Sequence, residues 1–172
     1  LAAGEEPVLS AARKTYDEFG FAQRQTPPWL FFFGSVGSWL KADETFFKAL
    51  NRLPYRTYIN IGLESVDHST LEMLGKPITP GQVKTAVERM ISVNDQYENV
   101  KVTANFVIGD TLDPAHIQSL TRMFRELPPP ADKRNTVFYL SPLQNSSKKR
   151  ELLPMVRAVQ QSTRYRVYLY LI

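Results

Sequence analysis

Residues 59–77, which read INIGLESVDHSTLEMLGKP, hold the side chains best suited to chemistry. Glu64 ends an apolar β-like run, and Lys76 follows after a short helix-like segment. A carboxylate at the end of a covered strand needs a charged partner or a ligand, because burying an unpaired charge is costly. Glu64 could therefore bind a ligand, or act as a general base beside the Lys76 cation. Two structural alternatives stay open: Glu64 as a cap or ion-pair member at the rim, and Lys76 as its partner or a solvated lysine.

Polar side chains also mark the other strand ends. Asn105 interrupts the β-rich run VTANFVIG, so its amide either pairs with a neighbour or reaches into a site. Ser35 lies in the Gly-Ser-rich segment 34–38, which we interpret as a flexible loop or as a place where backbone approaches a ligand closely. Ser141 and Gln144 follow a later strand and have a weaker claim to substrate contact.

The composition excludes several kinds of site. The sequence contains no cysteine, which removes disulfides, thiolate metal sites and cysteine nucleophiles. His68 and His116 lie far apart without ligand spacing, so we predict no metal-binding side chains. A reducing, cytoplasmic setting is compatible with this composition. The net charge of +4 is mild and the basic residues are scattered, which gives a nucleic-acid surface only limited support.

Strand-like and helix-like segments alternate along the 172 residues, enough for one domain with a sizeable core. Strands are expected at 27–34, 57–64, 100–109, 136–141 and 165–172. Helices are expected near 8–19, 43–53, 69–74, 80–91, 113–127 and 148–161. Capping boxes at Ser69–Glu72 and Thr79–Gln82, and Asp113 before a first-turn proline, set three of the helix starts.

This alternation predicts an α/β fold of right-handed βαβ units on a parallel sheet. The first strand, WLFFFG, is apolar on both faces, which is typical of a sheet covered on both sides. The order suits part of a (β/α) barrel or, less well, a doubly wound open sheet. Ligands gather at the C-terminal strand ends in either case. No apolar run is long enough for a membrane span, so we predict no membrane association.

The segment INIGLESVDHSTLEMLGKPITPGQVKTAVERM, followed by VKVTANFVIGD, resembles the radical S-adenosylmethionine enzymes. The shared pattern is a strand ending in Gly-x-Glu/Gln-Ser, an acidic turn, a short Leu-rich helix and Gly/Asn-Lys/Arg. A helix and a strand ending in Gly follow. The resemblance covers residues 57–127 and is closest to the branch with the oxygen-independent coproporphyrinogen oxidases and the cobalamin-binding members. Elsewhere it extends only to the strand–helix order.

The resemblance implies the C-terminal portion of a TIM-like partial (β/α)₆ barrel, with residues 1–172 as a single fragment of that domain. The IGLES strand is similar to the family's fourth strand and VTANFVIG to its fifth. The first strand and its cysteine loop are then expected upstream of Leu1. Exposed strand edges are expected to let such a fragment dimerise.

The resemblance also implies an S-adenosylmethionine pocket. Glu64 and Ser65 match positions near the cofactor, Lys76 a position that meets its methionine carboxylate, and Asn105 a position near its ribose hydroxyls. A cation suits a carboxylate, and an amide or carboxylate suits hydroxyls. Ser35, Ser141 and Gln144 are weaker substrate-contact predictions.

This sequence departs from the family pattern in three places. The Gly-Ser-rich segment 34–38, which follows the strand similar to the family's third, lacks the acidic residue that some members carry. The CxxxCxxC that binds the [4Fe-4S] cluster is absent, and Gly109-Asp110-Thr111 stands where Gly-Leu-Pro is usual. The resemblance therefore implies that the cluster ligands lie outside this chain and that the chain alone is inert. Two other functions stay open: a barrel lyase or isomerase with Glu64 as base, and a non-catalytic module that binds a nucleotide or a partner.

Overall fold

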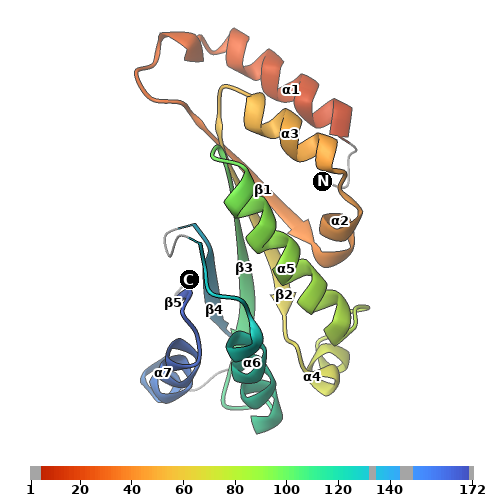
Figure 1. Cartoon of the computed structure of the whole chain (residues 1–172), viewed down its shortest axis with the longest axis vertical. Helices are drawn as coiled ribbons and strands as arrows, with labels where there is room; N and C mark the ends of the chain where they lie inside the picture. Colours follow the sequence, from red (N-terminus) through yellow and green to blue (C-terminus); the bar gives the residue numbers. More distant parts are fainter. Residues whose placement is uncertain (1–4, 132–134, 144–148, 171–172) are drawn as a thin grey trace.

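The computed structural model describes residues 5–131, 135–143 and 149–170, and within them the chain forms an α/β fold (Figure 1). Five strands make one all-parallel sheet in the order β1-β2-β3-β4-β5. The strands are β1 (Trp29–Ser35), β2 (Arg56–Glu64), β3 (Val100–Ile108), β4 (Val137–Pro142) and β5 (Arg166–Leu169). All five predicted strands are therefore confirmed, and their order along the sheet follows the sequence without a reversal.

Helices precede or connect the strands, as the alternation predicts. They are α1 (Glu5–Glu18), η1 (Phe21–Gln23), α2 (Val36–Lys41), α3 (Glu44–Arg52), α4 (His68–Met73), α5 (Pro80–Gln96), α6 (Pro114–Glu126), η2 (Lys149–Leu152) and α7 (Leu153–Gln161). None of the helices that the structure describes combines the length and apolar character needed to cross a membrane.

Local capping explains where the longer helices begin. Thr79 accepts from the Gln82 backbone N–H while the Gln82 side chain accepts from the Thr79 N–H, so the predicted capping box starts α5. Asp113 caps α6 and Pro114 occupies its first turn, also as predicted.

Two local predictions are wrong. Asp67, and not Ser69, caps α4, because the Asp67 carboxylate accepts from both the N–H and the hydroxyl of Thr70 at 2.9 Å. For the segment 34–38, the flexible-loop alternative is the one that is wrong. Ser35 ends β1 and caps α2, which starts at Val36.

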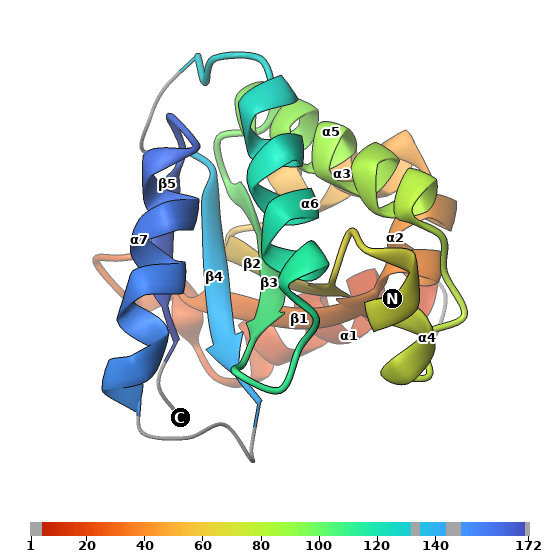
Figure 2. The same cartoon turned by 90° about the horizontal axis from the view of Figure 1, so that it is seen from below.

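The hydrophobic core lies on one face of the sheet. Every second residue of β2, including Ile59, Ile61 and Leu63, is fully buried against the helices. The buried faces of α1, α2, α3, α5 and α7 belong to the same cluster, as do Leu120 and Phe124 of α6. Figure 2 shows α5, α6 and α7 following one another along the outside of the central strands.

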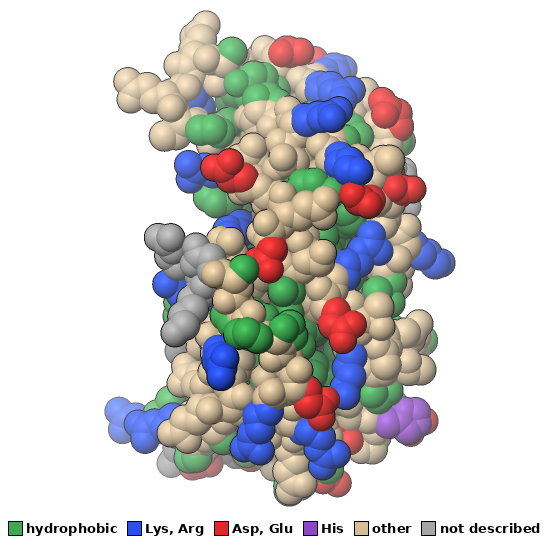
Figure 3. All heavy atoms as spheres, in the orientation of Figure 1, with side chains coloured by type: hydrophobic (Ala, Val, Ile, Leu, Met, Phe, Trp, Pro, Cys, Tyr) green, Lys and Arg blue, Asp and Glu red, His purple; other side chains and the backbone are tan. Residues whose placement is uncertain are grey.

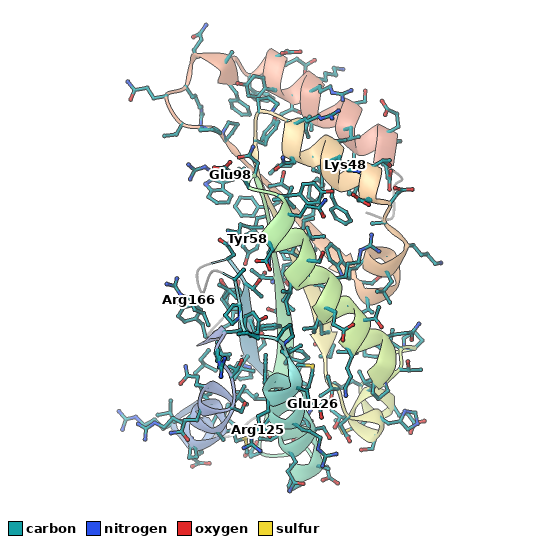
Figure 4. The ribbon with its side chains drawn as sticks, in the orientation of Figure 1. Lys48, Tyr58, Glu98, Arg125, Glu126 and Arg166 are labelled. Atoms are coloured by element: carbon teal, nitrogen blue, oxygen red, sulfur yellow. The ribbon has the colours of Figure 1, made fainter. Side chains whose placement is uncertain are left out.

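The opposite face of the sheet is not covered by any helix that the structure describes. Trp29, Phe31 and Phe33 of β1 are 49%, 61% and 81% exposed on this side. The prediction that β1 is covered on both faces is therefore wrong. In Figure 4 the labelled Tyr58 and Arg166, which belong to this face, lie to the left of α5. We call this side the open face.

Candidate ligand site at the ends of β1 and β2

A pocket of about 300 Å³ lies where β1 and β2 end. The lining comes from three segments: the β1–α2 junction, the end of β2 and the α4–α5 connection. Its lining residues are Gly34, Ser35, Val36, Gly37, Gly62, Glu64, Lys76, Pro77 and Ile78. Most are small or apolar, so Glu64 and Lys76 supply the charges. The volume is at the lower end of the range for small-molecule sites.

Glu64 and Lys76 form an ion pair, with 3.0 Å between the Lys76 Nζ and a Glu64 carboxylate oxygen. The side chain of Lys76 is 41% exposed and that of Glu64 is 20% exposed. Glu64 and Lys76, which the sequence indicates for ligand binding or chemistry, therefore meet in one pocket. Because the ammonium group has three donors and is half-exposed, it can hold an anionic ligand group as well as Glu64.

The backbone at Glu64 is unusual. Glu64 has φ +65°, which makes it the one non-glycine with a positive φ among the described residues. The β2–β3 register also shifts between Gly62 and Glu64. A bulge at a strand end redirects a side chain, and the left-handed conformation costs about 1 kcal/mol for a residue with a Cβ. This strained backbone conformation directs the Glu64 carboxylate toward the pocket.

The Glu64 carboxylate lies very close to the backbone of Gly62. A Cβ built on Gly62 would lie 2.8 Å from a Glu64 carboxylate oxygen. The Glu64 side chain thus folds back over its own strand, into space that any larger residue at position 62 would occupy.

Ser65 does not line the pocket. Its side chain is fully buried, and its Oγ lies 2.8 Å from Nδ1 of His116 on α6. The same Oγ accepts from the Asp67 N–H at 2.9 Å. Ser65 therefore fixes the turn that follows Glu64, one residue away from the ligand site predicted for it.

His116 is equally buried, and its Nε2 lies 2.8 Å from the carbonyl oxygen of Val107 on β3. Burial lowers the pKa of His116, against smaller opposite effects of the Val107 carbonyl and the Asp67 carboxylate. Sequence reasoning missed His116. The only available signal was its position in the first turn of α6, directly after the end of β3.

Asn105 lies on the open face and not in the pocket lining. Its Oδ1 accepts from the Asn60 amide at 3.3 Å, and Asn60 also donates to the Thr103 hydroxyl at 3.0 Å. Thr103 in turn donates to the Tyr58 hydroxyl at 2.9 Å. The neighbour-pairing alternative for Asn105 thus has a partner, and the half-buried amide still faces the uncovered side.

The chain of hydrogen bonds continues to β4. Tyr139 lies beside Tyr58, Tyr168 and Tyr170, and its pKa is raised to about 12, first by burial and then by its hydrogen bond to Tyr58. Ser141, half-buried, follows two residues later on the same face. Gln144 lies outside the described residues. Of the two weaker predictions that the structure describes, Ser35 lines the pocket and Ser141 does not.

In residues 5–131, 135–143 and 149–170 no group of three or more His, Cys, Asp or Glu side chains could hold a metal ion. His68 is exposed and lies 3.3 Å from Glu72 one helical turn away. The pocket therefore offers one cation, one carboxylate and small residues, which suits a small polar organic ligand.

In comparisons with known proteins, no protein-family model, no curated protein and no solved structure matches the chain.

Proposed function

We propose that this chain forms the C-terminal part of a radical S-adenosylmethionine enzyme barrel and one side of its adenosylmethionine pocket. The observation that carries the proposal is the Glu64–Lys76 pair, 3.0 Å apart, in a pocket at the C-terminal ends of two adjacent parallel strands. Ligands of parallel α/β folds bind at this end of the strands. The sequential strand order, with the buried helix faces in one cluster, supports a partial barrel.

The donor set fits adenosylmethionine. Lys76 is the cation for the methionine carboxylate, and Glu64 is an acceptor for the amino group or the ribose hydroxyls. The small residues Gly34, Ser35 and Gly37 leave the opposite wall open to a ring system. Ser65 acts indirectly, by holding the turn after Glu64. Asn105 contributes only if the ligand extends from the pocket onto the open face.

The iron–sulfur cluster does not fit this chain, because the sequence has no cysteine to ligate it. When bound, adenosylmethionine and the cluster together supply the radical chemistry of the family. The residues of this chain would bind and orient the methionine and ribose parts. The chain alone is therefore expected to bind the cofactor without turning it over.

Calorimetric titration of the chain with adenosylmethionine, S-adenosylhomocysteine and adenosine tests the pocket. Lys76→Met removes the cation, and we expect at least about tenfold weaker adenosylmethionine binding, since a charge-assisted hydrogen bond is lost. Lys84→Met is the matched control, because Lys84 forms an ion pair of the same length, 3.0 Å, with Glu126 on the helix-covered side.

The loss should be smaller for adenosine, which has no carboxylate. Equal affinity of wild type and Lys76→Met for adenosylmethionine would remove Lys76 from the site. If the folded chain binds none of the three ligands, the cofactor role is wrong. A lyase or isomerase activity that needs no iron and that disappears in Glu64→Gln would favour the non-radical function instead.

A further inference from the structure

The open face collects most of the exposed aromatic surface of the molecule. Of the eight large hydrophobic side chains that the described residues expose, five belong to β1 or lie at β5. These five are Trp29, Phe31, Phe33, Tyr168 and Tyr170. An 81% exposed phenylalanine on a strand is not explained by packing, and contiguous exposed aromatic surface marks binding sites.

The strand register shows that these rings share one face. Phe31 pairs with Tyr58, which pairs with Lys101, and paired residues of neighbouring strands point to the same side. On the other half of the sheet Tyr139 pairs with Tyr168. Aromatic residues of β1 and β2 thus form one group, and those of β4 and β5 a second.

The rings are arranged as open platforms. Trp29 and Phe31 stack with 6.1 Å between centroids and 25° between planes, and Phe31 lies 5.7 Å from Tyr58. Tyr139 lies 6.3 Å from Tyr168 and 5.6 Å from Tyr170. Flat ligand rings can stack on such groups regardless of their substituents.

Basic side chains border both platforms. Arg56 lies over the Trp29 ring at 5.9 Å, and Lys101 and Arg166 belong to the same face. A carboxylate, Glu98, shares a small hollow with Trp29 and Arg56. By contrast, Figure 3 shows acidic and basic side chains interspersed over the helix-covered side.

The centre between the platforms is polar. Tyr58, Asn60, Thr103 and Asn105 form the hydrogen-bonded chain described above, and the two amides are only half-buried. Side-chain amides at the centre of a stacking surface can form hydrogen bonds with the edges of bases.

From these observations we propose that the open face binds single-stranded nucleic acid. The aromatic side chains of β1, β4 and β5 stack on unpaired bases, and Arg56, Lys101 and Arg166 contact the phosphates. A second copy of the chain fits this face less well, because the three cations would oppose those of the partner across the interface. The site goes beyond the proposed cofactor pocket: it shares Asn105 with the outer part of that proposal, but its aromatic and basic side chains lie outside the pocket lining.

The experiment is fluorescence anisotropy of labelled ten-nucleotide oligouridylate and oligoadenylate with the chain, without adenosylmethionine. We expect saturable binding that weakens about twentyfold between 50 and 200 mM salt, as roughly three phosphate contacts to a single strand would cause. A hairpin duplex of the same length should bind more weakly, since its bases are not available for stacking.

Two pairs of variants separate stacking from charge. Phe33→Ser should weaken binding at least about fivefold, whereas Phe19→Ser, at an exposed phenylalanine after α1, should not. Arg166→Ala should weaken binding and flatten the salt dependence, whereas Arg157→Ala on α7 should not. All four positions are exposed, so the fold should tolerate each change.

Absence of saturable binding at 50 mM salt would overturn the proposal and leave the cofactor pocket untouched. Binding that Phe33→Ser does not weaken would also overturn it, because charge alone would then explain the affinity. Sedimentation velocity of the same samples tests whether the open face instead binds a second copy of the chain. A wild-type dimer that Phe33→Ser abolishes, without nucleic-acid binding, would make the open face a protein interface.

Discussion

Ser65 and His116, which are 51 residues apart in the sequence, meet with 2.8 Å between Oγ and Nδ1, and neither side chain is exposed. The carbonyl of Val107 can only accept a hydrogen bond, so Nε2 of His116 carries the proton. Nδ1 then accepts from the Ser65 hydroxyl. A neutral histidine therefore joins the ends of β2 and β3 directly behind the Glu64–Lys76 pocket.

Acidification should weaken the fold through His116. Burial lowers its folded-state pKa below that of the unfolded chain, so the unfolded state binds the extra proton first. The free energy of unfolding is then unaffected well above pH 6.5 and falls as the pH drops through and below that value. The Asp67 carboxylate facing the ring moderates the effect without reversing it.

Urea unfolding at pH 7.5 and 5.0 measures this loss, with an upper limit of about 1.4 kcal/mol per pH unit from one group. His116→Gln should flatten the dependence, whereas His68→Gln, at the exposed histidine of α4, should not. An unchanged pH dependence in His116→Gln would contradict the account of the buried histidine.

Gly62→Ala should disturb the pocket more than the fold. The new Cβ would meet a Glu64 carboxylate oxygen at 2.8 Å, and this end of a flexible side chain can rotate away. The ion pair with Lys76 would be lost, at a cost below about 1 kcal/mol because both groups are partly exposed. Urea denaturation and adenosylmethionine titration should show nearly normal stability with reduced affinity. A large loss of stability would mean that the Gly62 backbone itself is needed.

Thr57 should tolerate loss of its hydroxyl. Its Oγ1 is buried without a hydrogen-bond partner among the described residues, whereas the hydroxyl of Thr103 bonds both Asn60 and Tyr58. Thr57→Val should leave stability unchanged or raise it by about 1 kcal/mol, and Thr103→Val should lower it by about 1 kcal/mol. Chemical denaturation of the two variants compares them directly, and the opposite order would refute this reasoning.

Local signals predicted most of the fold. The capping box of Thr79 and Gln82 and the Asp113–Pro114 start act within one helical turn, so the sequence window contains both partners. The Ser69–Glu72 box failed because Asp67, two residues earlier, accepts from the Thr70 N–H and from the Ser69 hydroxyl, so that the helix starts before Ser69. The capping-box pattern alone does not indicate which of two nearby candidate residues caps the helix.

Long-range placement was predicted only in part. The strand-end rule placed Glu64 beside the end of β1, because parallel strands end at the same edge of a sheet, whereas Lys76 reaches the pocket from the α4–α5 connection. It did not foresee the bond between Ser65 and His116, since the pairing depends on how α6 packs behind β2 and β3. The apolar pattern of WLFFFG could not distinguish a covered strand from one that leaves the aromatic rings of one face exposed.

The most direct measurement of the central claim is adenosylmethionine cleavage by the full-length natural protein, purified anaerobically, reconstituted with iron and sulfide and reduced. The account predicts 5′-deoxyadenosine and methionine from the wild type and from Lys84→Met, and at least about tenfold less from Lys76→Met. Undiminished cleavage by Lys76→Met would remove the assigned pocket. An intact, folded full-length protein that binds no cluster and forms no 5′-deoxyadenosine would contradict the proposed function.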